Sequence, residues 1–410
     1  MPARLRIADL ETIRVGEFPN ILFVRLRTDG GLVGLGETFF GASEVEAYLH
    51  STAASRILGQ DASRLDALRV GLQNYVGTRS TGVEARGNSA LDIALWDLVG
   101  QASGRRVVDL LGGQTRESIR GYNTCAGYRY VRATRGQAWQ NWGLPGEGGA
   151  AGPYEDLDAF LHGRAGELAQ SLLDQGITGM KMWPFDEAAY RNGGLHITAE
   201  ELDQALEPFR QARRAVGSRM DLMVELHGLW TLPVALRIAH AFEAEGLSPY
   251  WIEDPLRPDD LASLAAFARG TRIPTTASEM LGGRQAFREL LEARAASIVM
   301  LDLGWCGGLT EGKAIAAMAE AFGLPVAPHD CTGPVVWTAS VHLSLNAPNA
   351  LIQETVRAFY TGWYRELVTG LPQVENGQVR LGTDAPGLGV ALSPGLVDRP
   401  DAIVRHTSAG

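Results

Sequence analysis

The chain has 410 residues, of which 45% are hydrophobic and 20% charged, and its formal net charge at pH 7 is −10. This balance is typical of a globular protein, and the length accommodates a barrel of about 250 residues together with a second domain. The acidic net charge and the lack of a dense Lys/Arg cluster in the sequence argue against a nucleic-acid-binding protein. An acidic protein that handles an anionic substrate needs local cations, such as a metal ion and a few placed Lys or Arg side chains.

Signals for secretion or membrane insertion are missing from the sequence. The N-terminal stretch lacks the apolar core of a signal peptide, and no run of about 18 apolar residues is long enough to span a membrane. The three cysteines, Cys125, Cys306 and Cys331, share no metal-binding spacing, and their odd number leaves no complete disulfide set. We therefore expect a cytoplasmic protein with reduced thiols that binds neither membranes nor nucleic acid.

Residues 1–118 are predicted to form a small α+β domain, because strand signals come first and helix signals follow. The expected strands lie at 5–15, 21–28 and 32–37, and the expected helices at 42–58, 62–76 and 88–104. Asp29, Gly30 and Gly31 predict the turn into the third strand. The last helix is the clearest, since it has a broad apolar face and Gly104 suits its C-terminal end.

Strand and helix signals then alternate through residues 119–355. The expected strands lie at 119–126, 177–183, 221–227, 249–253, 273–279, 297–303, 324–329 and 350–354. The expected helices lie at 156–175, 199–216, 232–246, 259–270, 284–294, 309–322 and 334–345. Thr198 and Glu201 form a capping box before the second of these helices. Such alternation predicts a parallel sheet, and eight repeats predict an α/β fold with a closed (β/α)8 TIM-like barrel.

Two further segments complete the domain prediction. Residues 132–155 contain Gly, Pro and Trp without periodicity, and we interpret them as a long loop at the mouth of the barrel. A disordered surface insertion is the alternative for that segment. Asn376 followed by Gly377 is a hairpin signature, and on that basis the tail, residues 356–410, is expected to return to the N-terminal domain and complete the cap.

Reactive side chains recur at the ends of successive predicted strands. Glu225, Glu253 and Glu279 are 28 and 26 residues apart. The series continues at the next three strands with Asp302, His329 and Glu354. A strand, a loop and a helix occupy about this length, so the spacing places one reactive side chain in each βα unit, at one mouth. Three carboxylates there suit a hard divalent cation such as Mg²⁺, whereas a single glutamate is more simply explained by a salt bridge or by exposure.

Asp302 and His329 are expected at the ends of adjacent strands. A buried carboxylate that holds one imidazole nitrogen leaves the other nitrogen free to act as a base. The alternative for His329 is a structural histidine in the core or in a loop.

Two other pairs are predicted to point into the same mouth, because side chains alternate along a strand. Lys181 shares a face with Trp183, so Lys181 is a candidate to contact an anionic oxygen or act as a base while Trp183 walls the pocket. The alternative for Lys181 is a solvent-facing strand end. His227 shares a face with Glu225, so it is a candidate proton donor or metal ligand, with a structural histidine as the alternative.

With these residues in place, the chain resembles the mandelate racemase subgroup of the enolase superfamily over essentially its whole length. The matching features are the Glu225, Glu253 and Glu279 set, the Glu253-Asp254-Pro255 tripeptide, the Asp302–His329 pair, Glu354 and the helix segment 87–97. The resemblance implies Mg²⁺-assisted abstraction of the proton α to a carboxylate, with His329 as the base and Asp302 orienting it. It also implies that the metal and Lys181 neutralise the enolate, and that a protonated Glu354 donates to its other oxygen, provided that its surroundings raise its pKa.

Two departures from the family pattern favour dehydration. Racemases of the family often keep Lys-x-Lys on the second strand, whereas Lys181 is followed by Met182 and Trp183, so the second base is missing. The third strand ends Glu225-Leu226-His227 instead of the common Asp-x-Asn, and a histidine at this position is similar to that of the subgroup's sugar-acid dehydratases, where it helps expel the β-hydroxyl. The resemblance thus implies a hydro-lyase that converts an aldonate or aldarate to a 2-keto-3-deoxy acid. An epimerase, racemase or cycloisomerase with Lys181 as second base, and a carboxylate-binding barrel without turnover, remain as alternatives.

The expected partner is a small carboxylate substrate, contacted by Trp183, Trp305, Lys181 and Glu354. The loop near Gly16–Asn20 and the segment 132–155 are expected to influence which stereoisomer fits. Barrels of this family usually assemble, so a homo-oligomer is also expected.

Overall fold

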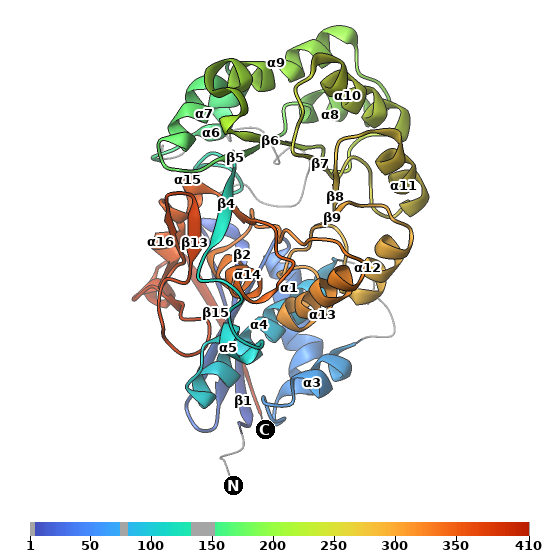
Figure 1. Cartoon of the computed structure of the whole chain (residues 1–410). Helices are drawn as coiled ribbons and strands as arrows, with labels where there is room; N and C mark the ends of the chain where they lie inside the picture. The colour runs from blue at the N-terminus through green and yellow to red at the C-terminus, as the bar shows by residue number, and fades with distance from the viewer. Residues whose placement is uncertain (1–4, 74–80, 133–151, 410) are drawn as a thin grey trace.

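The computed structural model describes residues 5–73, 81–132 and 152–409. A ring of strands surrounded by helices occupies the upper part of Figure 1, and an antiparallel sheet with its own helices lies below it. The described N- and C-terminal ends lie close together at the lower end of this second unit. The architecture is the α/β barrel with an α+β cap that the sequence predicted.

Short parallel strands form the barrel wall. They are β4 (Ile119–Thr124), β5 (Gly179–Met182), β6 (Asp221–Glu225), β7 (Trp251–Glu253), β8 (Thr275–Ala277), β9 (Ile298–Val299) and β10 (Gln353–Thr355). Neighbours in this order pair in parallel from β4 to β9, and β10 pairs with β4. The strand expected at 324–329 is reduced to parallel bridges from Val326 to Val299 and Ala350. Pro325 and Pro328 lack the N–H groups that a longer ladder needs, yet the bridges still close the ring.

Helices cover the outside of this ring, close to the predicted positions. They include α9 (Ala199–Val216), α10 (Leu232–Glu245), α11 (Leu261–Gly270), α12 (Gly283–Glu292), α13 (Gly308–Ala321) and α14 (Pro334–Asn346). The capping box of Thr198 and Glu201 is present at the start of α9. The helix expected over 156–175 is divided into α6 (Asp156–Leu161) and α7 (Ala165–Leu173), since Gly163 between them adopts a φ of +79°. None of the helices in the described residues combines the length and the apolar character that crossing a bilayer requires.

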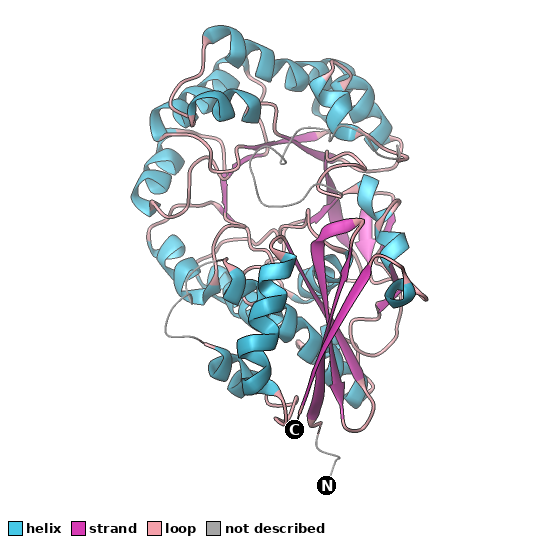
Figure 2. Cartoon of the chain, turned by 180° about the vertical axis from the view of Figure 1, so that it is seen from behind, coloured by secondary structure: helices cyan, strands magenta, loops and turns pink. Residues whose placement is uncertain are grey.

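The capping domain is built on a four-stranded antiparallel sheet, drawn in magenta at the lower right of Figure 2. Its order is β15 (Ala402–Ser408), β1 (Ile7–Val15), β2 (Phe18–Thr28) and β3 (Val33–Phe39). The helical run α1 (Ala42–Tyr48), η1 (Leu49–Ala53) and α2 (Ala54–Ile57) is followed by α3 (Leu65–Leu72) and α4 (Val83–Ser103). Because β15 pairs with β1 from Asp9 to Val15, the tail does return to this domain, as predicted.

Both faces of the capping sheet are largely buried at β1, β2 and β3, whereas the edge strand β15 is mostly exposed. Ile13 and Phe23 pack into the core shared with the barrel, whereas Leu22 packs into the core beneath α1 and α4. Gly34 and Gly36 of β3 allow α4 to lie directly on the strand, since a Cβ would stand 2.1 Å from Ala94 O at the first and 1.9 Å from Ala90 O at the second. This close approach fixes α4, and with it the side chains that α4 extends toward the barrel.

The Asn-Gly hairpin forms, but it does not join the capping sheet. Asn376 and Gly377 have φ values of +50° and +69°, as a two-residue type I′ turn requires, between β12 (Gln373–Glu375) and β13 (Gln378–Arg380). β13 pairs with the start of β4, where the buried Val379 extends the barrel core. The prediction that this hairpin marks the return to the cap was therefore wrong in its location, and the return is made further on by β15.

His342 ties α14 to both the cap and the tail. Every residue of α14 is buried, and the Nδ1 of His342 accepts from the Val108 N–H while its Nε2–H donates to Leu388 O, each at 3.0 Å. Burial lowers the pKa of His342 from 6.5 to about 4. Below pH 6.5 His342 is therefore protonated in the unfolded chain but stays neutral in the folded protein. The free energy of unfolding consequently decreases as the pH falls from 6.5 toward 4.

We therefore expect His342→Gln to flatten the pH dependence of folding. Between pH 7 and pH 5 the wild-type protein should lose about 2 kcal/mol more unfolding free energy than the variant, because glutamine does not titrate. Urea denaturation at the two pH values measures the difference. Equal losses in both proteins would show that His342 is already protonated in the folded state at pH 5.

Candidate active site

A cleft of about 650 Å³ opens at the carboxyl ends of the barrel strands, next to the capping domain. Its barrel lining includes Lys181, Trp183, Glu225, His227, Glu279, Trp305 and His329. Glu253, Asp302 and Glu354 are fully buried and contact these lining residues from behind. The structure thus brings together every site residue that the sequence predicted.

Glu225, Glu253 and Glu279 form a three-carboxylate cluster. They end β6, β7 and the segment after β8, and one oxygen of each lies within 4.8 Å of the others because parallel barrel strands finish at one rim. The backbone N–H of His227 donates to Glu225 Oε1 at 2.6 Å. The Trp251 indole N–H donates to Glu253 Oε2 at 3.1 Å, so both carboxylates are oriented without being neutralised.

The electrostatics of this cluster fit a divalent cation. Burial raises the pKa of all three carboxyls, and the charge of Glu225 raises that of Glu253 further. The oxygens are acceptors only and come from three separate strands, which leaves coordination positions for water and substrate. The residues present therefore match the requirements of Mg²⁺.

Lys181, on β5, is the cation at the base of the cleft. Its Nζ lies 2.6 Å from Glu253 Oε1 and 3.0 Å from Glu354 Oε1. Glu225 Oε2 is 3.5 Å away. Burial by itself lowers the pKa of the Lys181 ammonium, but Glu253 and Glu354 outweigh burial and raise it well above its ordinary value. Lys181 is thus held protonated among carboxylates, which suits charge neutralisation and not proton abstraction.

His329 and Asp302 form a hydrogen-bonded pair in the wall of the cleft. The Nδ1–H of His329 donates to Asp302 Oδ2 at 2.7 Å, and the Gly304 N–H holds the other Asp302 oxygen at the same distance. The Nε2 of His329 faces Glu279 Oε2 at 3.0 Å. Burial lowers the pKa of His329, but Glu279 and Glu354 outweigh burial and raise it well above its ordinary value. The proton affinity of this imidazole therefore depends on the charge that Glu279 carries.

Glu354 is ionised, contrary to the protonated donor that the resemblance implied. Burial raises its pKa, but Lys181 and His329 outweigh burial, and the pKa falls to about 2. The Thr124 hydroxyl donates to Glu354 Oε1, and the Asp330 N–H donates to Oε2 at 2.8 Å. The surroundings thus do not supply the raised pKa on which that role depends, and Glu354 instead holds Lys181 in place.

A second histidine, His227, lines the same cleft and is paired with a buried carboxylate. His227 follows β6 with a φ of +49°, and its Nδ1 lies 2.7 Å from Asp186 Oδ2. The Tyr190 hydroxyl donates to the same oxygen at 3.3 Å. Burial lowers the pKa of His227, but Asp186 and Glu225 outweigh burial and raise it to about 10. His227 therefore carries a proton at neutral pH.

Asp186 is a site residue that the sequence reasoning missed. It opens α8 (Asp186–Asn192), a short helix after β5, and no strand-end pattern marks it. The available signal is chemical, because a buried imidazole at a barrel mouth needs an acceptor to fix its tautomer. Asp186 is the first carboxylate after Lys181 in the chain.

The two predicted tryptophans each pack against one of the histidines. The Trp305 ring lies 5.4 Å from the His329 ring, and the Trp183 ring lies 6.0 Å from the His227 ring. The Trp305 indole N–H donates to the backbone oxygen of Phe39 at 3.2 Å, which anchors this wall to the cap. Arg86 of α4 also lines the cleft; it was missed because the predicted helix began after it.

Within the described part of the chain, neither of the two loops expected to influence substrate choice lines the cleft. Among the described residues, Gly16–Asn20 do not line it, and Gly16 and Asn20 instead border a separate surface depression. The Asn20 side-chain amide donates to Val131 O at 2.8 Å, and Val131 does line the cleft. Of the predicted long loop, residues 133–151 lie outside the described residues.

Comparison with known protein families shows to which family the chain belongs. A model of the family described as enolase C-terminal domain-like matches residues 164–396, which contain both histidine pairs and the three-carboxylate cluster. The N-terminal domain model of mandelate racemase / muconate lactonizing enzyme matches residues 14–112. The chain belongs to the mandelate racemase subgroup of the enolase superfamily.

Solved structures and characterised relatives agree with this membership. A mandelate racemase subgroup enolase from Agrobacterium tumefaciens, solved with a succinimide residue, sodium and phosphate, is 48% identical with a TM-score of 0.87 over 98% of this chain and 99% of its own. An enolase from Sargasso Sea environmental sequencing is 40% identical with a TM-score of 0.85 over 99% of both chains. D-galactonate dehydratase of Ralstonia pickettii is 28% identical, over 96% of this chain and 94% of its own length.

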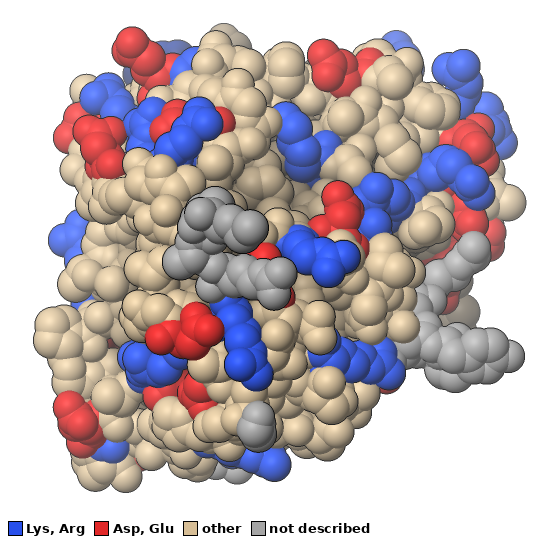
Figure 3. Space-filling model, turned by 90° about the horizontal axis from the view of Figure 1, so that it is seen from below, with Lys and Arg blue, Asp and Glu red and all other residues tan. Residues whose placement is uncertain are grey.

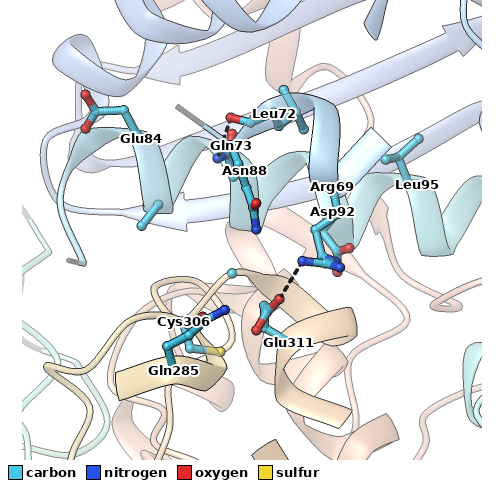
Figure 4. Close-up of a pocket in the computed structure, with 13 residues that line it drawn as sticks. Arg69, Leu72, Gln73, Glu84, Asn88, Asp92, Leu95, Gln285, Cys306 and Glu311 are labelled. Carbon is cyan, nitrogen blue, oxygen red and sulfur yellow. Dashed lines mark hydrogen bonds and ion pairs between the residues drawn. The ribbon is translucent and has the colours of Figure 1, made fainter. Parts of the chain in front are cut away.

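In this enolase-superfamily chain a second cavity, of about 700 Å³, lies between α3 and α4 of the cap and α12 and α13 of the barrel (Figure 4). Arg69 of α3 pairs with Glu311 of α13 at 3.2 Å, as the dashed line in Figure 4 marks. Asp92 of α4 accepts from the N–H and the hydroxyl of Thr310 at 2.9 and 2.6 Å. These side chains pair between the capping domain and the barrel, so this cavity lies at the interface of the two domains.

Removing one carboxylate of the cluster tests its fit to a cation. We expect Glu279→Gln to weaken Mg²⁺ binding at least about 10–100-fold, the loss usual for altering even the groups that support a metal ligand. Isothermal titration calorimetry of the purified protein measures the affinity. Glu292→Gln, which changes an exposed carboxylate of α12, is the matched control and should leave the affinity unchanged. Equal affinities in all three proteins would rule out Glu279 as a ligand.

Proposed function

We propose that the protein is a Mg²⁺-dependent dehydratase of a sugar acid, an aldonate or aldarate, and that it forms a 2-keto-3-deoxy acid. One observation carries this proposal: His329 and His227, each held by a buried carboxylate (Asp302 and Asp186), line one cleft with Glu225 and Glu279 of the three-carboxylate cluster. β-Elimination of water from a hydroxy acid requires a base for the α-proton and an acid for the leaving hydroxyl. The cleft contains one candidate for each role.

Relatives named as D-galactonate dehydratases support the same reaction class. The D-galactonate dehydratases of Ralstonia pickettii and Variovorax paradoxus align with nearly the whole chain, each at 28% identity. Their names describe loss of water from a sugar acid, which is the chemistry that the two histidine pairs suit. At this identity the relatives support the class of substrate and not the individual sugar.

In the proposed reaction His329 takes the α-proton at Nε2, while Asp302 holds its Nδ1–H and stabilises the imidazolium that forms. When bound, a divalent cation would stabilise negative charge on the substrate carboxylate and offset the charge of Glu279 that raises the pKa of His329. The protonated Lys181 adds a fixed positive charge at the base of the cleft, where negative charge develops on the substrate.

His227 gives its proton to the leaving β-hydroxyl, which departs as water. With a pKa of about 10, this imidazole is protonated at neutral pH before the substrate arrives. Asp186 holds Nδ1, so Nε2–H is the position that can donate to substrate. The enol that remains takes a proton at the former β-carbon, and the product is the 2-keto-3-deoxy acid.

The same geometry disfavours the alternatives. Two-base racemisation or epimerisation would need Lys181 neutral, whereas its ammonium is held by Glu253 and Glu354. A binding barrel without turnover has no use for two oriented histidines, one of them kept protonated by Asp186.

Turnover of a sugar-acid library in the presence of Mg²⁺ tests the proposal. We expect at least one aldonate or aldarate to yield a 2-keto acid, detected as its semicarbazone. Running the reaction in D₂O separates the alternatives, because deuterium at the α-carbon of recovered substrate without elimination would establish an isomerase. Thermal stabilisation by a sugar acid and Mg²⁺ with neither product nor exchange would instead establish a binding protein.

The two histidine pairs should separate the two halves of the reaction. We expect Asp186→Asn to slow dehydration about 10²–10⁴-fold, the usual contribution of a positioned acid, while exchange of the α-proton in D₂O persists. Asp302→Asn should slow both exchange and dehydration, because it disturbs the base. Asp109→Asn is the control, because it breaks a partly exposed ion pair with Arg106 and neither residue lines the cleft. If Asp186→Asn abolished exchange as well, His227 would not be a separate acid.

A further inference from the structure

A buried tyrosine lines the cleft with its hydroxyl unpaired. Tyr130 lies in the turn after β4 and is 7% exposed, and in the described part of the chain its hydroxyl neither donates to nor accepts from another group. Buried tyrosines usually have a hydrogen-bond partner for this group, so the hydroxyl is available to a molecule bound in the cleft. On the outer face shown in Figure 3, by contrast, the basic and acidic side chains of the described residues are interspersed and not gathered by sign.

The backbone holds Tyr130 in place from both sides. The Tyr130 N–H donates to Gly127 O at 3.0 Å, and Gly127 forms an antiparallel bridge with Glu155. The next residue, Val131, has a φ of +48°, which is rare for a β-branched side chain. The side-chain amide of Asn20 donates to Val131 O at 2.8 Å and so supports this conformation. Strained backbone of this kind is typical of ligand-binding segments, and here it presents a preorganised phenol.

Three rings form a series along this side of the cleft. The Tyr130 ring lies 5.6 Å from the Trp183 ring, which in turn lies 6.0 Å from the imidazole of His227. Trp183 therefore separates the phenol from the proposed acid. In the proposed reaction the substrate carboxylate lies at the three-carboxylate cluster and the β-hydroxyl at His227. Tyr130 is thus placed beyond the leaving group, further along the carbon chain of the substrate.

Groups from several sides of the barrel act on the Tyr130 hydroxyl. Burial raises its pKa well above the ordinary value, and nearby acidic groups, among them Cys331, Asp186 and Glu279, raise the pKa further. These three residues follow different barrel strands, so the hydroxyl lies over the mouth and not against one wall. It stays protonated at neutral pH, and a phenol in this state can donate a hydrogen bond to a substrate oxygen.

We propose that the Tyr130 hydroxyl donates a hydrogen bond to the substrate hydroxyl at C4, one carbon beyond the leaving group, so that the enzyme selects polyhydroxy acids over acids that lack this hydroxyl. This inference rests on the proposed dehydratase function and names a specificity-determining residue within it. A cleft of about 650 Å³ falls in the size range of small-ligand sites and accommodates a six-carbon acid.

The expected preference follows from the cost of an unpaired polar group. A site built to hydrogen-bond a substrate hydroxyl rejects the analogue that lacks it, because the protein's own group is then left without a partner. That cost corresponds to roughly 5- to 150-fold in kcat/KM. We therefore expect kcat/KM of the wild-type protein for a sugar acid to exceed that for its 4-deoxy analogue by about 30-fold.

Two other roles for Tyr130 compete with this one. The phenol could assist departure of the β-hydroxyl, or it could only pack against Trp183. In either case its loss would slow the sugar acid and the 4-deoxy analogue by the same factor, because both carry the leaving group. The ratio between the two substrates separates the explanations, and it does not depend on how much of a variant is folded.

The test compares the wild-type protein, Tyr130→Phe and Tyr250→Phe on the sugar acid that the wild-type protein converts fastest and on its 4-deoxy analogue, each with Mg²⁺. We expect the ratio of kcat/KM to fall to within about 3-fold in Tyr130→Phe, since phenylalanine has no hydroxyl to leave unpaired. Tyr250 lies just before β7, away from the cleft, and its variant is the control that should keep the wild-type ratio. A wild-type ratio in Tyr130→Phe, or no preference in the wild-type protein, would overturn the proposal.

Binding keeps the test decisive if no sugar acid is converted. The probes are then the aldonates and aldarates of the library and the 4-deoxy analogue of the tightest binder, measured by calorimetry with the Mg²⁺-loaded protein. Binding that depends on the C4 hydroxyl and loses this dependence in Tyr130→Phe, with no turnover, would refute the dehydratase function and retain the role of Tyr130. Dehydration that is indifferent to the C4 hydroxyl would refute the role of Tyr130 alone. Binding of no sugar acid would refute both.

Discussion

Glu225, Glu253 and Glu279 bring one carboxylate oxygen each within 4.8 Å of the others at one barrel rim, and the site depends on how the repulsion between them is offset. A closed ring of parallel strands gives them little freedom to separate, because each side chain leaves the end of a hydrogen-bonded strand. Lys181 offsets part of the charge by lying between Glu253 and Glu354. The remaining negative charge suits a cation, so the cluster could hold a metal ion.

The capping domain holds the loop that follows Asp302 against this cluster. The Thr38 hydroxyl of β3 donates to Gly304 O at 3.0 Å, and the Ser89 hydroxyl of α4 accepts from the Gly307 N–H at 2.9 Å. Glu37, also on β3, accepts from the N–H of Val335 at 3.2 Å and so caps the start of α14. On both sides of His329, therefore, the backbone is fixed by polar groups of the cap.

The mouth of the barrel could be predicted from sequence because the fold itself generates a periodic signal. Each βα unit repeats the strand end, so Glu225, Glu253 and Glu279 follow at even spacing. Asp186 and Arg86 lie in segments without that period. The folding of α8 brings Asp186 to His227, and the folding of α4 brings Arg86 to the cleft. No local pattern records such contacts.

The ionisation state of Glu354 also could not be predicted from the sequence, although its position could. The spacing placed it in the last strand of the barrel, where it does lie, as the middle residue of β10. Its charge is decided by Lys181, by His329 and by the Asp330 N–H, which meet only in three dimensions. Sequence periodicity thus predicts where a carboxyl group is but not which protons it binds.

The division of labour between the two histidines follows from which carboxylate each one faces. Asp186, which lies outside the three-carboxylate cluster, is the charge that raises the pKa of His227 most, and Glu225 of the cluster adds to it. The Nε2 of His329 instead faces Glu279, which belongs to that cluster, so its proton affinity falls with any positive charge the cluster takes up. In the proposed mechanism, two imidazoles with similar carboxylate partners at Nδ1 therefore take opposite roles, His227 as the acid and His329 as the base. This asymmetry is what an elimination that removes a proton and a hydroxyl from neighbouring carbons requires.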